Sequence, residues 1–331
     1  MKDVPLDVPG PRAHLRGTLR LLERFAGLSG AVLDPSLVGL LGAPHLLPLD
    51  VPQEARGLKY DAYLSPGPAG LAWGVAIGDR WEQVAFRRRA EAWIAASPVA
   101  DRLVAAQAVG AALAGASPAF TLAVGYDAPG RPPRIKLYFQ EERWQTGVAT
   151  AAALRGLLPR LAPGCVLPDW IPGDRAVGVV TVELLSGTSG LHGGMGVKVY
   201  LGGPVAGDCA QGGPPEAMDL MRTLATASPA PGGWYYLTVR MRPGEAVRYS
   251  ANKIYNPVST GFTQNGAGLP AAWADVAGLF AVAGQSDTLE RLRVDLLECP
   301  DLRVVPTATA LDAGARQADV YGGAWDLTGA G

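Results

Sequence analysis

Five pairs of strand-like segments recur along this chain, with helix-compatible stretches between them. The pairs are 57–64 with 71–77, 119–126 with 134–140, 176–186 with 195–201, 233–242 with 247–255, and 302–310 with 317–325. Their connections, such as SPGPAG, DAPGRPP and RPGEA, are rich in the glycine, proline and acidic residues that tight turns use. Each pair therefore predicts an antiparallel hairpin.

The stretches between the hairpins are typical of helices. They cover 81–115, 143–161, 214–227 and 270–298, with 11–28 and 33–42 before the first hairpin. In RLLERFAGL and DTLERLRVDLLE, apolar residues recur at helical spacings, with the charges on the opposite face. A unit of two helices and two strands thus repeats about five times.

This repeat predicts a single α+β domain over residues 1–331. If all helices lie on one side of the sheet, its other face becomes an interior once the sheet closes. We therefore expect an antiparallel β-barrel of about ten strands with the helices outside, which is wide enough to hold a ligand.

Three of the five lysines share the frame Lys-x-Tyr: Lys136 with Tyr138, Lys198 with Tyr200, and Lys253 with Tyr255. Each frame lies in the second strand of a predicted hairpin. Residues i and i+2 of a strand point to the same face, so each frame places an ammonium beside a phenol. One such frame is common on edge strands, but three in the same place predict a lumen lined with cations and hydroxyls.

Such a lining favours a phosphorylated ligand, because ammonium groups and protonated tyrosines are donors to phosphate oxygens. Arg134 lies two residues before Lys136, and Arg240 and Arg248 belong to the fourth hairpin. The planar guanidinium group of arginine can donate two parallel hydrogen bonds to phosphate oxygens. With an allylic diphosphate, these donors would stabilise the leaving group, and tyrosine faces would stabilise the allyl cation.

The composition excludes several functional classes. The formal net charge is −1 and 48% of the residues are hydrophobic, which supports a large core but no nucleic-acid binding. Three dispersed cysteines indicate a reducing compartment rather than disulfides or a zinc site. The first residues do not resemble a signal peptide, and the uncharged stretch 103–126 is broken by Ser117-Pro118. We expect a soluble, cytoplasmic protein that does not bind membranes.

Common catalytic motifs are absent from the sequence. There is no GxxxxGK[ST] loop and no GxGxxG, HExxH or GxSxG motif, and the three histidines lie in unrelated contexts. No aspartate-rich DDxxD-like cluster offers oxygen ligands to Mg²⁺. We therefore expect no cofactor and no requirement for Mg²⁺.

Taken together, these motifs resemble those of the ABBA-type aromatic prenyltransferases, which include the dimethylallyltryptophan synthases and their bacterial relatives. The similarity covers nearly the whole repeat and includes RIKLYF at 134–139, GVKVYL at 196–201, NKIYNP at 252–257 and ADVYGGAWD at 318–326. The resemblance implies a ten-stranded barrel that transfers a prenyl group. It also implies a set of residues that bind diphosphate and shield the cation: Lys136, Tyr138, Lys198, Tyr200, Lys253, Tyr255 and Tyr321, with Arg134 and Arg240 as further cations.

The chain departs from the family pattern in two places. Gly196 stands where the family usually has an arginine two residues before the lysine, and residues 72–75 read Ala-Trp-Gly-Val where a further arginine is expected. Either the diphosphate contacts are fewer, or Arg134, Arg240 and Arg248 compensate.

The resemblance also suggests residues for the aromatic acceptor. Family members that alkylate indoles often hold the N–H with a glutamate on the first strand, where this chain offers Asp61. Lys59 could instead form an ion pair with Asp61. Glu183 is a second candidate catalytic acid, and Trp73 and Tyr236 are candidate acceptor contacts, although Trp73 fits a packed core equally well.

We therefore expect an enzyme that transfers a dimethylallyl or longer prenyl group to an indole or a tryptophan-containing molecule or peptide. One alternative is a phenol, naphthoquinone or phenazine acceptor, and another is a non-catalytic barrel that binds a phosphorylated ligand. The sequence leaves open the acceptor, the prenyl length, the carbon attacked, and whether the protein is a monomer or a homodimer.

Overall fold

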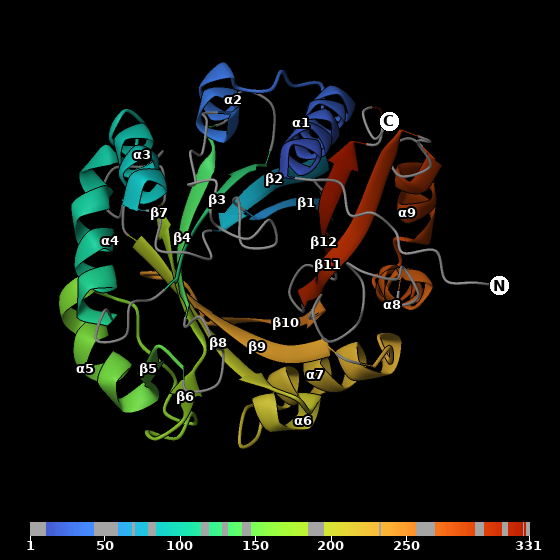
Figure 1. The fold of residues 1–331 in the computed structure, drawn as a ribbon. Coiled ribbons are helices and arrows are strands. Elements are labelled where there is room, and N and C mark those ends of the chain that lie inside the picture. The colour runs from blue at the N-terminus through green and yellow to red at the C-terminus, as the bar shows by residue number, and fades with distance from the viewer. Residues whose placement is uncertain are drawn as a thin grey trace, which may run out of the picture.

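The computed structural model describes residues 11–42, 59–67, 70–78, 84–113, 119–127, 132–140, 147–184, 195–231, 233–255, 269–294, 301–312, 317–326 and 328. Ten strands form one closed antiparallel barrel in the order β1-β12-β11-β10-β9-β8-β7-β4-β3-β2 (Figure 1). These strands are β1 Lys59–Gly67, β2 Gly70–Gly78, β3 Ala119–Tyr126, β4 Arg134–Gln140, β7 Val179–Leu184, β8 Met195–Gly203, β9 Gly233–Met241, β10 Arg248–Tyr255, β11 Leu302–Asp312 and β12 Gln317–Asp326. The expected barrel is confirmed.

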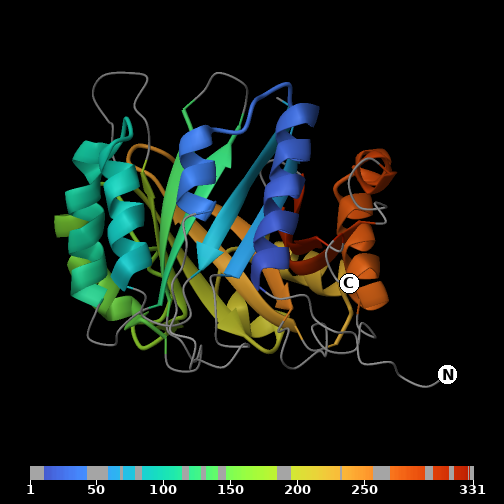
Figure 2. The same ribbon diagram turned by 45° about the horizontal axis from the view of Figure 1, so that its top comes forward.

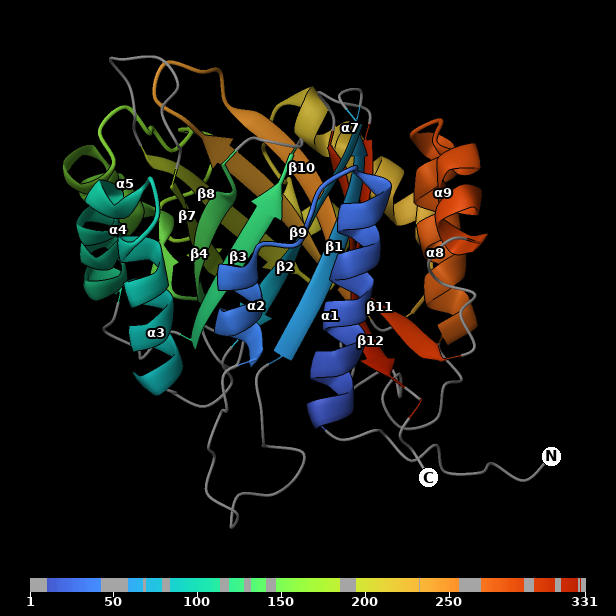
Figure 3. The same cartoon turned by 90° about the horizontal axis from the view of Figure 1, so that it is seen from above.

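The helices form an outer layer around the strands (Figure 1). They are α1 Pro11–Leu28, α2 Pro35–Gly42, α3 Val84–Ala95, α4 Ala100–Leu113, α5 Ala151–Leu161, α6 Ala206–Cys209, α7 Pro215–Ala227, α8 Leu269–Val282 and α9 Ser286–Leu292. Figures 2 and 3 show α3 and α4 on one side of the barrel and α8 and α9 on the other. None of the described helices is both long and apolar enough to span a bilayer.

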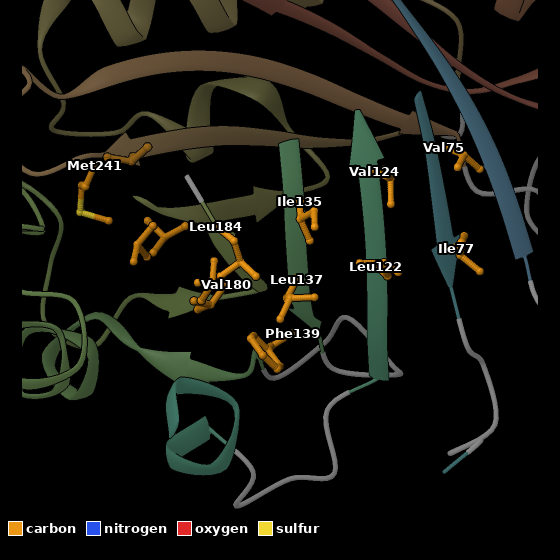
Figure 4. Packing of buried hydrophobic residues seen from close by; sticks show 14 of the residues in the cluster. Val75, Ile77, Leu122, Val124, Ile135, Leu137, Phe139, Val180, Leu184 and Met241 are labelled. Carbon is orange, nitrogen blue, oxygen red and sulfur yellow. The ribbon is translucent and has the colours of Figure 1, made fainter. Parts of the chain in front are cut away.

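Strand alternation separates the two faces of the barrel wall. In β7, Val180 and Val182 are fully buried in the apolar core between strands and helices, whereas Thr181 and Glu183 lie on the opposite face, toward the lumen. The apolar side chains of β2, β3, β4 and β7 form one continuous layer (Figure 4). Burial of this layer against the helices provides the main driving force for folding and leaves the inner face available for polar residues.

All five predicted hairpins are present, but some boundaries differ. The stretch 81–115 divides into α3 and α4 around Pro98, because proline cannot continue a helix. The stretch 270–298 divides near Gly284, whose φ of 71° is left-handed. The expected strand 176–186 also divides, since Ala176–Val177 (β6) pairs outside the barrel with Ala149–Thr150 (β5).

Candidate active site

The register of four adjacent strands brings the predicted cations together on the lumen face. Lys136 on β4 pairs with Glu183 on β7, and Lys198 on β8 pairs with Arg240 on β9. Thr181 pairs with both Tyr138 and Lys198, which links the two pairs. Because directly paired residues share a face, these side chains converge from four strands.

Glu183 lies at the centre of this group. Its Oε1 is 3.1 Å from Lys198 Nζ, and its Oε2 is 3.3 Å from Arg240 Nε and 3.1 Å from the Arg242 NH2 group. The glutamate side chain is only 3% exposed. We call Lys136, Lys198, Arg240 and Arg242 the cation layer.

The charges of the cation layer perturb one another. Burial alone would raise the pKa of Glu183, but Lys198, Lys136, Arg240 and Arg242 hold it well below its usual range. Burial and the neighbouring Lys198 and Arg134 lower the pKa of Lys136 well below that of a free lysine. Four cations around one carboxylate therefore make this part of the lumen attractive to an anion.

The other predicted arginines differ in position. Arg134 lies on the lumen face of β4, two residues before Lys136, and pairs with Asp127 at 2.5 Å. Arg248 pairs in register with Arg240, but its side chain is 59% exposed and lies 4.0 Å from Glu245. Arg134 thus adjoins the cation layer, whereas Arg248 lies near solvent.

Tyrosines gather beside the cations. The ring centroid of Tyr200 lies 6.3 Å from that of Tyr138 and 6.2 Å from that of Tyr236. The Tyr63 and Tyr321 centroids are 5.5 Å apart, and Lys136 Nζ lies 5.8 Å from the centroid of Tyr63. We call these five tyrosines the aromatic layer. Burial raises the pKa of Tyr63, Tyr138 and Tyr321 above the usual value, so their hydroxyls remain donors at neutral pH.

Glycines make room for these rings against the barrel wall. A Cβ at Gly125 would lie 1.7 Å from the Tyr63 hydroxyl, and one at Gly74 would lie 2.7 Å from the Tyr63 ring. A Cβ at Gly202 would lie 2.5 Å from the Tyr236 ring. The missing side chains leave the space that both rings occupy against the neighbouring strands.

The third Lys-x-Tyr frame faces the opposite way, so the expectation that all three frames line the lumen is wrong. Lys253 Nζ contacts Asp275 Oδ2 on α8 at 2.7 Å and the carbonyl oxygens of Ser228 and Ala230 at 2.6 Å each. The Tyr255 hydroxyl donates to Asp275 Oδ2 at 3.0 Å. These residues form a buried polar cluster between the barrel wall and the helices, away from the cation layer.

Trp73 also lies on the outer face, so its expected place on the lumen wall is wrong. Its ring stacks on Tyr126 at 4.5 Å, and Nε1 donates to Ser29 Oγ at 3.0 Å. The side chain is 1% exposed and belongs to the apolar core. The packed-core alternative for Trp73 is therefore the one observed, whereas Tyr236 does lie in the lumen.

The candidate acids differ in their surroundings. Asp61 pairs with Ala76 between β1 and β2, but its side chain lies outside the described residues. Asp319 on β12 was not predicted: its Oδ1 accepts from Ser65 Oγ at 2.6 Å and from Gln317 Nε2 at 3.3 Å. Burial raises the pKa of Asp319. Asp319 is therefore a better proton acceptor than Glu183.

Three residues of the lumen had no predicted role, although each lies two positions along the chain from a residue that was predicted to be part of the site. Tyr63 follows Asp61, Arg242 follows Arg240, and Asp319 precedes Tyr321. Extending strand alternation by one step could have identified them. Among the described residues, no group of three or more His, Cys, Asp or Glu side chains is placed to hold a metal ion.

No family model and no curated protein match this sequence, but solved structures share its fold. 6-Dimethylallyltryptophan synthase from Micromonospora olivasterospora, in complex with DMASPP and Trp, is 19% identical with a TM-score of 0.62 over 94% of this chain and 96% of that one. 5-Dimethylallyltryptophan synthase from Streptomyces coelicolor is 16% identical, with a TM-score of 0.58 over 97% and 99%. AnaPT from Neosartorya fischeri is 11% identical, with a TM-score of 0.56 over 97% and 96%. The chain thus has the barrel fold of the dimethylallyltryptophan synthases, as the resemblance in its motifs implied.

Proposed function

We propose that this protein is an aromatic prenyltransferase that moves a dimethylallyl group from its diphosphate to an indole, with tryptophan or a tryptophan-containing peptide as the acceptor. The observation that carries this proposal is the cation layer next to the aromatic layer in one lumen. Structural neighbours with dimethylallyltryptophan synthase activity in their names support it.

In the proposed reaction, the C–O bond of the donor breaks and the diphosphate leaves with the electron pair. Lys198, Lys136 and Arg240 stabilise the charge that develops on the leaving oxygen, which is the electrostatic contribution that dominates many enzymes. No metal ion is part of this proposal, because the cation layer supplies the positive charge.

The aromatic layer acts on the other product of ionisation. The faces of Tyr138, Tyr200 and Tyr321 attract the allyl cation and exclude water. A carbon of the acceptor ring then attacks the cation, and the ring regains aromaticity when a base removes the proton from that carbon. Asp319 is placed in the lumen to accept this proton.

The test is product formation from dimethylallyl, geranyl and farnesyl diphosphates against tryptophan, tryptophan-containing peptides, a naphthoquinone and a phenazine, each with and without EDTA. We expect a mass increase of one prenyl unit on an indole acceptor, and retention of activity in EDTA. Lys198→Ala should reduce turnover by about tenfold or more, the loss of a charge-assisted contact.

Three outcomes would each contradict a part of the proposal. Transfer only to a non-indole acceptor would leave a prenyltransferase but reject the indole assignment. Binding of diphosphates without any prenylated product would support a non-catalytic binding protein. Complete loss of activity in EDTA, restored by Mg²⁺, would reject metal independence.

A further inference from the structure

The side chain of Arg242 crosses from the end of β9 to lie over Gly196 of β8. Val197 pairs with Met241, so Gly196 and Arg242 are the next positions along these antiparallel strands. A Cβ at Gly196 would lie 3.1 Å from Arg242 Cγ and 3.1 Å from Glu183 Oε2. Glycine at position 196 therefore leaves the space that the arginine stem occupies.

Two acids hold the guanidinium of Arg242 at the cation layer. Its Nε and NH2 groups each lie 3.1 Å from Glu183 Oε2, and its NH1 group lies 3.6 Å from Glu245 Oε1. The Arg242 side chain is 18% exposed, so it is largely withdrawn from water. Glu183 thus positions Arg242 beside Arg240 without a ligand.

The local charge balance favours an anion at this place. Glu183 is surrounded by four cations, two of them the guanidinium groups of Arg240 and Arg242. Buried like charges are stabilised by a counter-charge of matching geometry, and an arginine fork can donate two parallel hydrogen bonds to phosphate oxygens. A diphosphate group meets both requirements.

We propose that Arg242 is a donor-binding residue, whose guanidinium reaches the diphosphate through the space above Gly196. This inference rests on the proposed function and adds to it a cation that no Lys-x-Tyr frame contains. It also accounts for the glycine at position 196 of β8, because Arg242, directly after the neighbouring strand β9, supplies the positive charge at that place. Glu183 is a positioning residue that orients Arg242 and Arg240.

A purely structural ion pair is the competing explanation, and it predicts a different result. In Arg242→Ala, Glu183 keeps Lys198 and Arg240 as partners, so no buried carboxylate is left alone and the fold should persist. A structural role would then lower the melting temperature and leave the affinity for diphosphate unchanged. A ligand role would instead weaken the affinity for diphosphate and leave the melting temperature near the wild-type value.

The experiment is calorimetric titration of inorganic diphosphate into the wild-type protein and three variants at one ionic strength, with melting temperatures alongside. We expect Arg242→Ala to weaken binding by about tenfold or more, as the loss of one charge-assisted contact predicts. The matched control Arg222→Ala removes a 73% exposed arginine that pairs with Asp219 on α7, and should bind like wild type. In the double variant Gly196→Arg/Arg242→Ala, the new side chain occupies the vacated space, so most of the affinity should return.

Equal affinity in wild type and Arg242→Ala would overturn the inference while leaving the proposed function intact. A folded double variant that binds no better than Arg242→Ala would also overturn it. If the double variant has a lowered melting temperature, Arg242→Lys and Arg242→Gln provide the test without a change at Gly196. The Lys variant should retain more affinity for diphosphate than the Gln variant, and equal affinities would count against Arg242. Wild-type protein that binds no diphosphate would overturn both proposals, whereas binding that depends on Arg242 without prenyl transfer would overturn only the proposed function.

Discussion

Glu183 and Asp319 show how surroundings give two lumen acids opposite properties. Glu183 contacts three cationic side chains, and its lowered pKa keeps it ionised at neutral pH. Asp319 accepts hydrogen bonds from two neutral donors, Ser65 and Gln317, and burial raises its pKa against a smaller lowering by Lys136. An acid whose pKa is raised toward neutrality is better suited to removing a proton, so Glu183, the acid that the sequence favoured beside Asp61, is the weaker candidate base.

The first prediction concerns this base. Asp319→Asn should lower kcat by about 100-fold, the effect typical of losing a general base, while the donor Kd remains near the wild-type value. Ser65→Ala is the matched control, since it removes a hydrogen bond to Asp319 but keeps the carboxylate. The measurements are single-turnover rates and calorimetric affinities. A normal rate in Asp319→Asn would mean that another group takes the proton.

The second prediction concerns Lys136 and pH. Its pKa is lowered by burial and by Lys198 and Arg134, with a smaller opposing effect of Glu183 and a further lowering by Arg240. A bound diphosphate favours the ammonium form and raises this pKa, so binding should take up a proton. Affinity should therefore fall as pH rises above the pKa of Lys136 in the free protein.

Calorimetry in two buffers of different ionisation enthalpy measures that proton uptake. Lys136→Arg is the control, because arginine stays charged and leaves only the titration of the ligand itself. Identical proton uptake in wild type and Lys136→Arg would show that Lys136 is already protonated in the free protein.

At the scale of elements, the role of each Lys-x-Tyr frame depends on which face of its strand the frame occupies, the lumen face or the face that packs on the helices. In β10 the lumen-facing residues include the polar Ser250 and Asn252, and Asn252 donates to Thr238 Oγ1 at 2.6 Å. The alternate residues Tyr249 and Ala251 pack in the outer core, and Lys253 continues their series. In β4 the phase is reversed, since the apolar neighbours of Lys136 face the helices.

The residues beside each lysine indicate which face of the strand it occupies, even though the three lysines share one sequence frame. Ile135 and Leu137 surround Lys136, whereas Asn252 precedes Lys253. A lysine between two apolar residues lies on the face opposite to them, which in this barrel is the lumen. The partner of Lys253 was beyond sequence reasoning, because Asp275 belongs to a helix whose docking on β10 only the tertiary structure shows.

The third prediction follows from this buried cluster. Lys253→Met leaves the carboxylate of Asp275 buried without its ammonium partner, which should lower the free energy of unfolding by about 3–5 kcal/mol. Turnover per folded molecule should change little, because the cluster lies outside the lumen. Urea denaturation and activity assays at low temperature provide the two measurements.

The double variant Lys253→Met/Asp275→Leu is the control for this assignment. Replacing both charges with apolar groups removes the unpaired carboxylate, so much of the lost stability should return. If Lys253→Met is as stable as wild type but inactive, Lys253 acts on the substrate and its outward placement is irrelevant.

At the scale of the whole molecule, closure of the barrel assembles the site from both ends of the described chain. β1 pairs with β12, and this seam sets Tyr63 directly opposite Tyr321. The hairpins and the helices between them were predictable because their signals are local, in turn residues and periodicity. The register between hairpins is not local, so the position of Glu183 among cations from different strands could not be predicted.

The last prediction tests whether closure at this seam protects the allyl cation. The Tyr63 and Tyr321 rings lie 5.5 Å apart, and Gly74 and Gly125 allow the Tyr63 ring to lie against the wall. Phe in place of either tyrosine keeps the aromatic face, whereas Ala removes it and admits water. Tyr63→Ala and Tyr321→Ala should therefore raise the ratio of free prenyl alcohol to prenylated acceptor, while both Phe variants should keep it near the wild-type value. Chromatography with mass detection gives both products from one reaction. A wild-type ratio in both Ala variants would assign the seam tyrosines to packing, and would leave Tyr138 and Tyr200 as the residues that face the cation.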